Sequence, residues 1–156
     1  MNKEIYALEN TPIEGHSVFL AGPTPRDHQS PSWRPDMIQM LRQKGYDGDI
    51  LIPEKRGNYL DYDYVTQTKW EVEHLNAADI ILFWVPRNIE TMPAFTTNIE
   101  FGEFMHSGKV ILGYPKDAAK MRYLQVRADM HNIPVAHSMF ETVEVLLSQI
   151  GLMPIK

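Results

Sequence analysis

The amino-acid sequence predicts an α/β fold, a three-layer sandwich in which helices cover both faces of a five-stranded parallel sheet. Two observations carry this prediction. Short apolar runs rich in β-branched and aromatic residues recur along the chain, as strands buried on both faces do. Amphipathic helical patterns separate these runs, and strands that alternate with helices pair in parallel through right-handed crossovers.

The five predicted strands are the most apolar short segments of the chain. SVFLAG and ADIILFWVP are the clearest, because each stops at glycine or proline after a run of large apolar residues. Three further segments resemble them, so the predicted strands are 17–22, 49–53, 78–86, 109–115 and 133–137.

Helical patterns fill the intervals between the strands. The first three predicted helices span 32–44, 64–77 and 98–107, and in the second the spacing of Val65, Val72 and Leu75 marks the side expected to face the sheet. A fourth helix is indicated by apolar residues between 121 and 128. The fifth carries an i, i+3, i+4, i+7 stripe over 143–150, behind a capping box formed by Ser138 and Glu141.

Length and composition indicate a single domain, residues 1–156, with a core that needs no metal or disulfide. The chain has no cysteine, no secretory signal pattern and no apolar run near the ~20 residues that span a bilayer, so we expect a cytoplasmic protein with no membrane partner. The net charge of -5 argues against a nucleic-acid polymer as partner. The histidines lack ligand spacing, and we expect no metal and no cofactor.

Basic residues follow four of the predicted strands, and ligands of parallel sheets bind beyond the carboxyl ends of the strands. These residues are Arg26, Lys55, Arg56, Arg87 and Lys116. In an acidic protein they could receive an anionic group such as a phosphate. The alternative is that they are solvated charges of ordinary loops.

The loop after the first strand begins with Gly22 and Pro23, and the glycine lets a ligand approach the backbone closely. The loop lacks the glycine patterns of the common nucleotide cradles, which disfavours a dinucleotide site. In the second helix, Trp70 and Glu71 fall away from the apolar stripe, together with Gln67 and His74. That face either borders the pocket or is an exposed polar surface.

Glu100 has two readings in the segment MPAFTTNIEFGE. Thr97-x-x-Glu100 fits a capping box, in which the glutamate accepts a hydrogen bond from the backbone at the helix start. The same residue lies in the first turn of a predicted helix that starts in the loop after the third strand, at the carboxyl edge of the sheet, where a carboxylate could face the anomeric carbon of a sugar. A helix N-terminus would then keep Glu100 ionised and nucleophilic at neutral pH. Glu103 is the second-choice carboxylate.

The order of FLAGP, WEVEHLNAADIILFWVP and TTNIEFGEFMHSGKVILGYP resembles the nucleoside 2-deoxyribosyltransferase superfamily, especially its nucleoside 2-deoxyribosyltransferase-like branch. This superfamily includes the deoxynucleoside 5'-monophosphate N-glycosidases. The likeness covers roughly residues 18–115 and implies a flavodoxin-like fold. It also implies that Glu100, in Ile99-Glu100-Phe101-Gly102, is the nucleophile, and that Glu71, eight positions before Asp79, helps to hold the ligand.

Two positions depart from the family pattern. Ala94 stands where the transferases have an aspartate that contacts the base or assists its departure. Phe19 stands where the family has a tyrosine that orients the nucleophile. Asn98 and the hydroxyls of Thr96 and Thr97 could supply part of the missing polar contact.

The resemblance implies a retaining displacement, in which Glu100 attacks C1' of a nucleoside or nucleotide and a covalent glycosyl-enzyme forms. Glu71 would fix the sugar hydroxyls, Trp70 or Phe95 would stack on the base, and Arg26 and Arg87 would bind a phosphate. The full set of expected ligand contacts is Gly22, Pro23, Arg26, Trp70, Asp79, Arg87, Phe95, Thr97 and Asn98. Alternatives are a non-catalytic nucleotide-binding domain and a flavodoxin-like cofactor carrier. Family members are homo-oligomers, so the same is expected here.

Overall fold

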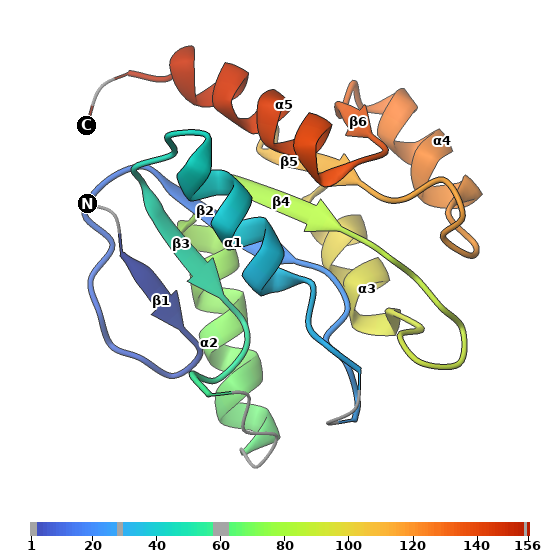
Figure 1. Ribbon diagram of the computed structural model, residues 1–156, viewed down its shortest axis with the longest axis horizontal. Coiled ribbons are helices and arrows are strands. Elements are labelled where there is room, and N and C mark those ends of the chain that lie inside the picture. The colour runs from blue at the N-terminus through green and yellow to red at the C-terminus, as the bar shows by residue number, and fades with distance from the viewer. Residues whose placement is uncertain (1–2, 28–29, 58–62, 155) are drawn as a thin grey trace.

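The computed structural model describes residues 3–27, 30–57, 63–154 and 156 (Figure 1). Its strands are β1 (Glu4–Tyr6), β2 (Ser17–Ala21), β3 (Asp49–Ile52), β4 (Ile80–Trp84), β5 (Val110–Gly113) and β6 (Val135–Ala136). Its helices are α1 (Arg34–Gln43), α2 (Tyr64–Ala77), α3 (Phe95–Phe104), α4 (Arg122–Met130) and α5 (Met139–Gly151). From β2 onward strand and helix alternate, as the sequence predicts. β1 and β2 follow each other with no helix between them.

The strands form one parallel sheet in the order β1-β3-β2-β4-β5-β6. The five predicted strands are confirmed and adopt the flavodoxin-like order. Their number was too low, because β1 extends the sheet beyond β3, with Ile5 paired to Leu51. Three residues are too few for a strand pattern to be recognised in a sequence, and only pairing with β3 makes this segment a strand.

Helices cover both faces of the sheet, so the three-layer sandwich is confirmed. Along β2, Val18 and Leu20 face one side with residues of α1 and α5, whereas Phe19 and Ala21 face the other side with residues of α2, α3 and α4. This alternation follows from the two-residue period of a strand. Both faces are apolar because both are buried.

The direction of the chain across the sheet reverses between β2 and β4. From β2 the chain crosses to β3 on one side and then returns to β4 on the other side. The loops beyond the carboxyl ends of β2 and β4 therefore run in opposite directions. Open α/β sheets bind their ligands at such a switch point. The fold places a cleft between the segment after β2 and the segment before α3.

The buried face of α2 differs in part from the predicted one, of which Leu75 alone is buried. Val65 and Val72 are 58% and 45% exposed, whereas Gln67 and Trp70 are 5% and 6% exposed. The indole packs against the ring of Phe19 and donates a hydrogen bond from Nε1 to the carbonyl oxygen of Glu9. A tryptophan buries far more apolar surface than a valine, so the helix turns Trp70 toward the sheet.

α3 begins at Phe95, three residues before the predicted start, and its cap residue Ala94 is left-handed with φ 61. α5 begins as predicted, with the Ser138 hydroxyl accepting a hydrogen bond from the Glu141 amide at 3.1 Å. Across the described residues, the helices are all too short or too polar to reach from one side of a membrane to the other.

Candidate active site

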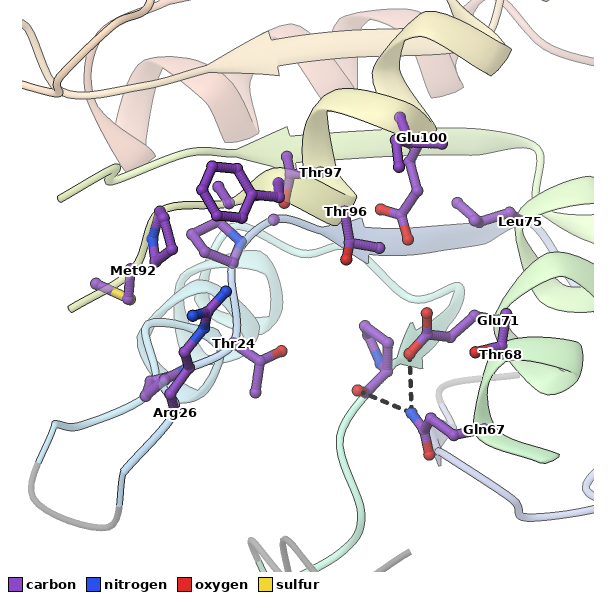
Figure 2. Close-up of a pocket in the computed structure, with 18 of the residues that line it drawn as sticks. Thr24, Arg26, Gln67, Thr68, Glu71, Leu75, Met92, Thr96, Thr97 and Glu100 are labelled. Atoms are coloured by element: carbon purple, nitrogen blue, oxygen red, sulfur yellow. Dashed lines mark hydrogen bonds between the residues drawn. The ribbon is translucent and has the colours of Figure 1, made fainter. Parts of the chain in front are cut away.

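A pocket of about 550 Å³ lies at the switch point of the sheet (Figure 2). This volume falls within the roughly 300–1,000 Å³ that is usual for small-molecule sites. The walls come from three segments: the loop 22–26 after β2, the segment 92–97 that leads into α3, and the side of α2 that carries Gln67 and Glu71. Glu100 and Glu103 of α3 also line the pocket.

Glu100 lies in the second turn of α3, and its carboxyl group points into the pocket (Figure 2). Burial, reinforced by the neighbouring carboxyls of Glu71 and Glu103, raises the pKa of Glu100 to about 8, against an opposing effect of Arg34. The expectation that a helix N-terminus keeps Glu100 ionised at neutral pH was therefore wrong. The helix begins earlier than predicted, and desolvation dominates.

The capping reading of Glu100 is also excluded by the start of α3. Thr97 lies inside the helix and is 2% exposed, while the cap position belongs to Ala94, which has no side-chain cap hydrogen bond. Thr97 lines the pocket rather than closing the helix end. Glu100 is thus left to face the pocket.

Glu71 reaches the pocket from α2 and points toward the same space as Glu100 (Figure 2). Burial raises the pKa of Glu71, while the hydrogen bond from Gln67 and the charge of Arg34 oppose this rise. The Gln67 amide donates from Nε2 to Glu71 at 3.0 Å and to the Pro53 carbonyl oxygen at 3.2 Å. Gln67 therefore ties the Glu71 carboxyl to the end of β3.

Arg34 is the pocket residue that the sequence did not reveal. Its side chain is 1% exposed and donates hydrogen bonds to Glu54 and Thr24, both at 2.9 Å. It also donates to the carbonyl oxygens of Leu20 and Gly22. One guanidinium thus holds the loop after β2 in place and puts a positive charge near Glu100. The only signal in the sequence was an arginine at the start of a predicted helix.

Gly22 and Pro23, two of the predicted ligand contacts, line the pocket. Gly22 has φ +145, and a Cβ at this position would overlap the carbonyl oxygen of Trp84 and lie 2.8 Å from the ring of Trp33. The glycine is required because β2 and β4 pack closely where the loop leaves the sheet.

Arg26 and Phe95, two further predicted ligand contacts, form the outer rim of the pocket. The Arg26 guanidinium carbon is 5.9 Å from the centroid of the Phe95 ring, and the ring is 65% exposed. This contact joins the loop after β2 to the start of α3. A flat aromatic surface and a positive charge are therefore side by side at the mouth.

Four predicted contact residues are not brought to the pocket by the structure. Trp70 is part of the core beneath α2. Asp79 precedes β4 at the opposite edge of the sheet, where it accepts hydrogen bonds from the Ser17 amide and from Lys156. Arg87 donates to the Lys120 carbonyl oxygen and to Asn98, so these two side chains bind each other outside the pocket lining.

The predicted basic residues at the strand ends do not gather around the pocket either. Of the five predicted there, Arg26 alone belongs to the pocket lining among the residues that the structure describes. Arg56 pairs with Glu9 at 2.7 Å and donates to the Glu4 carbonyl oxygen of β1. Strands that are adjacent in the sequence are not all adjacent in the sheet, so their loops spread along its edge.

Phe19 is fully buried on the core side of β2 and does not line the pocket, whereas Ala94 does. Of the two departures noted in the sequence, Ala94 therefore borders the cavity directly. Its methyl group leaves that part of the wall without a carboxyl.

The chain matches one family of known proteins over most of its sheet. The family described as nucleoside 2-deoxyribosyltransferase like matches residues 15–118, which is two thirds of the chain. The matched region runs from just before β2 to beyond β5 and includes both Glu71 and Glu100. No curated protein matches the chain.

Proposed function

Because the chain belongs to the nucleoside 2-deoxyribosyltransferase-like family, we propose that it cleaves the N-glycosidic bond of a nucleoside or nucleotide through a covalent glycosyl-glutamate. Membership of the family supports glycosyl transfer at a nucleoside in general. The proposal assigns the nucleophile to Glu100. Whether water or a second base accepts the sugar depends on how well the occupied site excludes water.

The observation that carries the proposal is the position of Glu100. Its carboxyl faces a cavity of about 550 Å³ at the switch point of the sheet, and no capping role competes for it. A second carboxyl, that of Glu71, faces it across the cavity. Enzymes that break glycosidic bonds usually have two carboxyl groups that face the same cavity.

In the proposed first step, an oxygen of the Glu100 carboxylate forms a bond to C1' as the bond from C1' to the base nitrogen breaks. The electron pair of that bond goes to the base. In the second step, water or another base attacks C1' from the opposite side and frees Glu100. Two inversions give net retention at C1'.

Glu71 has a supporting role in this proposal. Held by Gln67, its carboxyl offers hydrogen-bond acceptors to sugar hydroxyls, and its charge opposes ionisation of Glu100. With a pKa of about 8, about a tenth of Glu100 is ionised at pH 7. The reacting carboxylate is thus a minor form at neutral pH that becomes dominant above pH 8.

The protonated state of Glu100 also favours a second candidate, a non-catalytic nucleotide-binding domain of the same fold. A neutral carboxyl donates a hydrogen bond to a ligand without attacking it. Binding of a nucleoside in a calorimeter, with no base released over long incubation between pH 7 and pH 9, would favour this candidate over the enzyme.

The proposal is tested by chromatographic screening of deoxyribonucleosides and ribonucleosides, with and without a 5'-phosphate and with an added acceptor base. We expect released or exchanged base, with a rate that rises roughly tenfold from pH 7 to pH 9 as Glu100 ionises. A rate that falls over this interval would contradict Glu100 as the nucleophile.

Homo-oligomeric assembly is part of the same proposal. Phe95, Ile99 and Val72 line the pocket yet are 65%, 71% and 45% exposed. Apolar side chains gathered at the mouth of a site are typical of contact surfaces. Light scattering of the purified protein should give a mass that is a multiple of 18.0 kDa, and a monomer at all concentrations would contradict this assembly.

A further inference from the structure

The pocket has two chemically different ends. At one end, Gln67 and Glu71 project from α2, and Glu100 points toward them from α3 (Figure 2). At the other end, Arg26, Thr24 and Met92 lie together, on the loop after β2 and the segment before α3 (Figure 2). This second end is mainly apolar, since the same two segments contribute Pro23, Pro25, Pro93, Ala94 and Phe95.

The two ends fit the two halves of a nucleoside. Carboxyl and amide oxygens at the Glu71 end accept hydrogen bonds from sugar hydroxyls. Proline, methionine and an exposed phenylalanine ring at the other end suit the flat face of an aromatic base. With C1' against Glu100, the base therefore extends toward Arg26 and Phe95.

A departing base takes the electron pair of the N-glycosidic bond, and this charge must be met by a proton or by a cation. The carboxyls in the described lining are those of Glu71, Glu100 and Glu103, and none of them belongs to the two segments that form the base end. Asp27 lies outside the lining and accepts a hydrogen bond from the Ser30 amide.

Among the residues that the structure describes, two arginines line the pocket near the base end. Arg34 is buried, and its guanidinium already donates to Thr24, Glu54 and two backbone carbonyl oxygens. Arg26 is the exposed one of the two. A guanidinium does not give up its proton at any pH at which proteins fold, so it cannot act as a general acid. It does donate strong hydrogen bonds to an anion. Arg26 is exposed and adjoins the Phe95 ring, so a base lying on that ring comes within its reach.

We propose that Arg26 receives the departing base as an anion and thereby selects substrates whose base forms a stabilised anion, with pyrimidine-2,4-diones preferred over cytosine. The inference rests on the proposed function, because it concerns the base released by attack of Glu100. It names a class of leaving group that the site favours.

The chemistry balances without an acid. As the Glu100 oxygen bonds to C1', the bond from C1' to N1 breaks, and its electron pair spreads from N1 onto the ring carbonyl oxygens. Arg26 donates hydrogen bonds to that negative charge, and the free base takes a proton from water after release. Cytosine carries an amino group in place of one carbonyl, so its anion is more basic and leaves more slowly.

The test is a series of 2'-deoxynucleosides that differ in the basicity of the leaving base: 5-fluorouracil, uracil, thymine and cytosine. Base release is measured in single turnovers at pH 7, where the N3–H of the pyrimidinediones stays mostly protonated and the same fraction of Glu100, about a tenth, is ionised for every substrate. We expect the rate to follow the acidity of the base, fastest for 5-fluorouracil and slowest for cytosine, over a range of at least about tenfold. Equal rates across the series, or release from purine nucleosides alone, would overturn the inference.

Two variants test the role of Arg26 itself, and its exposed position makes both expected to fold, as circular dichroism would verify. Arg26→Gln should slow release by about 10²-fold, most for the most basic leaving base, as loss of a single donor to developing charge does. Arg26→Lys keeps the charge and should recover part of the rate. A loss confined to 5'-phosphorylated substrates would overturn the inference and make Arg26 a phosphate contact.

The proposed function and this inference fail in different ways. If no nucleoside loses its base, both are wrong. If bases are released at a rate that does not depend on their basicity, only the role of Arg26 is wrong, and Glu100 keeps its assignment.

Discussion

Glu100→Gln should lower the rate of base release by at least about 10³-fold, because an amide cannot form the glycosyl ester that the proposed reaction requires. The pocket itself should remain, since the amide has nearly the same shape and Glu100 makes no capping contact. Single-turnover chromatography with the best substrate from the screen measures this loss. A nucleoside should still bind the variant in a calorimeter.

Glu103→Gln is the matched control for this experiment. Glu103 lines the same pocket, lies on the same helix one turn further along, and is exposed to solvent. Its replacement should change the rate by no more than about tenfold. If the two variants lose activity equally, or if Glu100→Gln keeps the parental rate, the nucleophile has been assigned to the wrong residue.

Glu100→Gln should also be more stable than the parent protein at alkaline pH. The pKa of Glu100 is about 8 in the folded protein and ordinary in the unfolded chain, so the folded state holds a proton that the unfolded state has lost. The free energy of unfolding of the parent therefore falls as pH rises from about 4.5 to about 8, by up to a few kcal/mol. Glu100→Gln lacks this titration and should be the more stable protein at pH 8 to 9 in urea unfolding, with little difference at pH 4.

Arg34→Met should destabilise the protein by about 3 to 5 kcal/mol, because it leaves the Glu54 carboxylate buried without its partner. The Glu54 side chain is 10% exposed and 2.9 Å from the guanidinium. The carbonyl oxygens of Leu20 and Gly22 lose their donors at the same time. A loss of this size is a large part of the roughly 5–15 kcal/mol that holds a domain together, and urea unfolding measures it.

The double variant Arg34→Met, Glu54→Leu separates the unpaired charge from the lost packing. Removing both charged groups should restore much of the stability, since an apolar pair of similar volume avoids the desolvation of two ions. The pKa of Glu100 should rise in both variants, because the charge of Arg34 opposes its rise in the parent. If Arg34→Met alone is as stable as the parent, this buried ion pair contributes nothing to the stability of the fold.

The sheet was largely predictable from the sequence. Five strands were recognised because each is a short apolar run whose burial on both faces is visible in its composition, as in SVFLAG. β1 was missed because its three residues become a strand only by pairing with β3. The start of α3 was placed three residues late, since a left-handed alanine before a helix has no signature in composition.

The site was predictable in part. Seven of the predicted site residues that the structure describes line the pocket: Gly22, Pro23, Arg26, Glu71, Phe95, Thr97 and Glu100. All but Glu71, which lies in the middle of α2, follow a strand or lie near the start of a helix. Arg87 and Asn98 lie near such segments too, yet their side chains turn to other partners. Asp79 precedes β4 and lies at the other end of the strands, where it binds Ser17. A position along the chain indicates which edge of the sheet a residue is near, but the direction of its side chain depends on the neighbours it meets.

The sequence by itself determined the α/β architecture and the candidate nucleophile, because the pattern of strands and the segment around Glu100 are local. Only the tertiary structure decided that Arg34 lies beneath the pocket, that Trp70 belongs to the core, and that Glu100 holds its proton at neutral pH. The reason is physical. Burial and the approach of charges from α1 and α2 set the ionisation of a carboxyl on α3, and the fold alone brings these distant segments together.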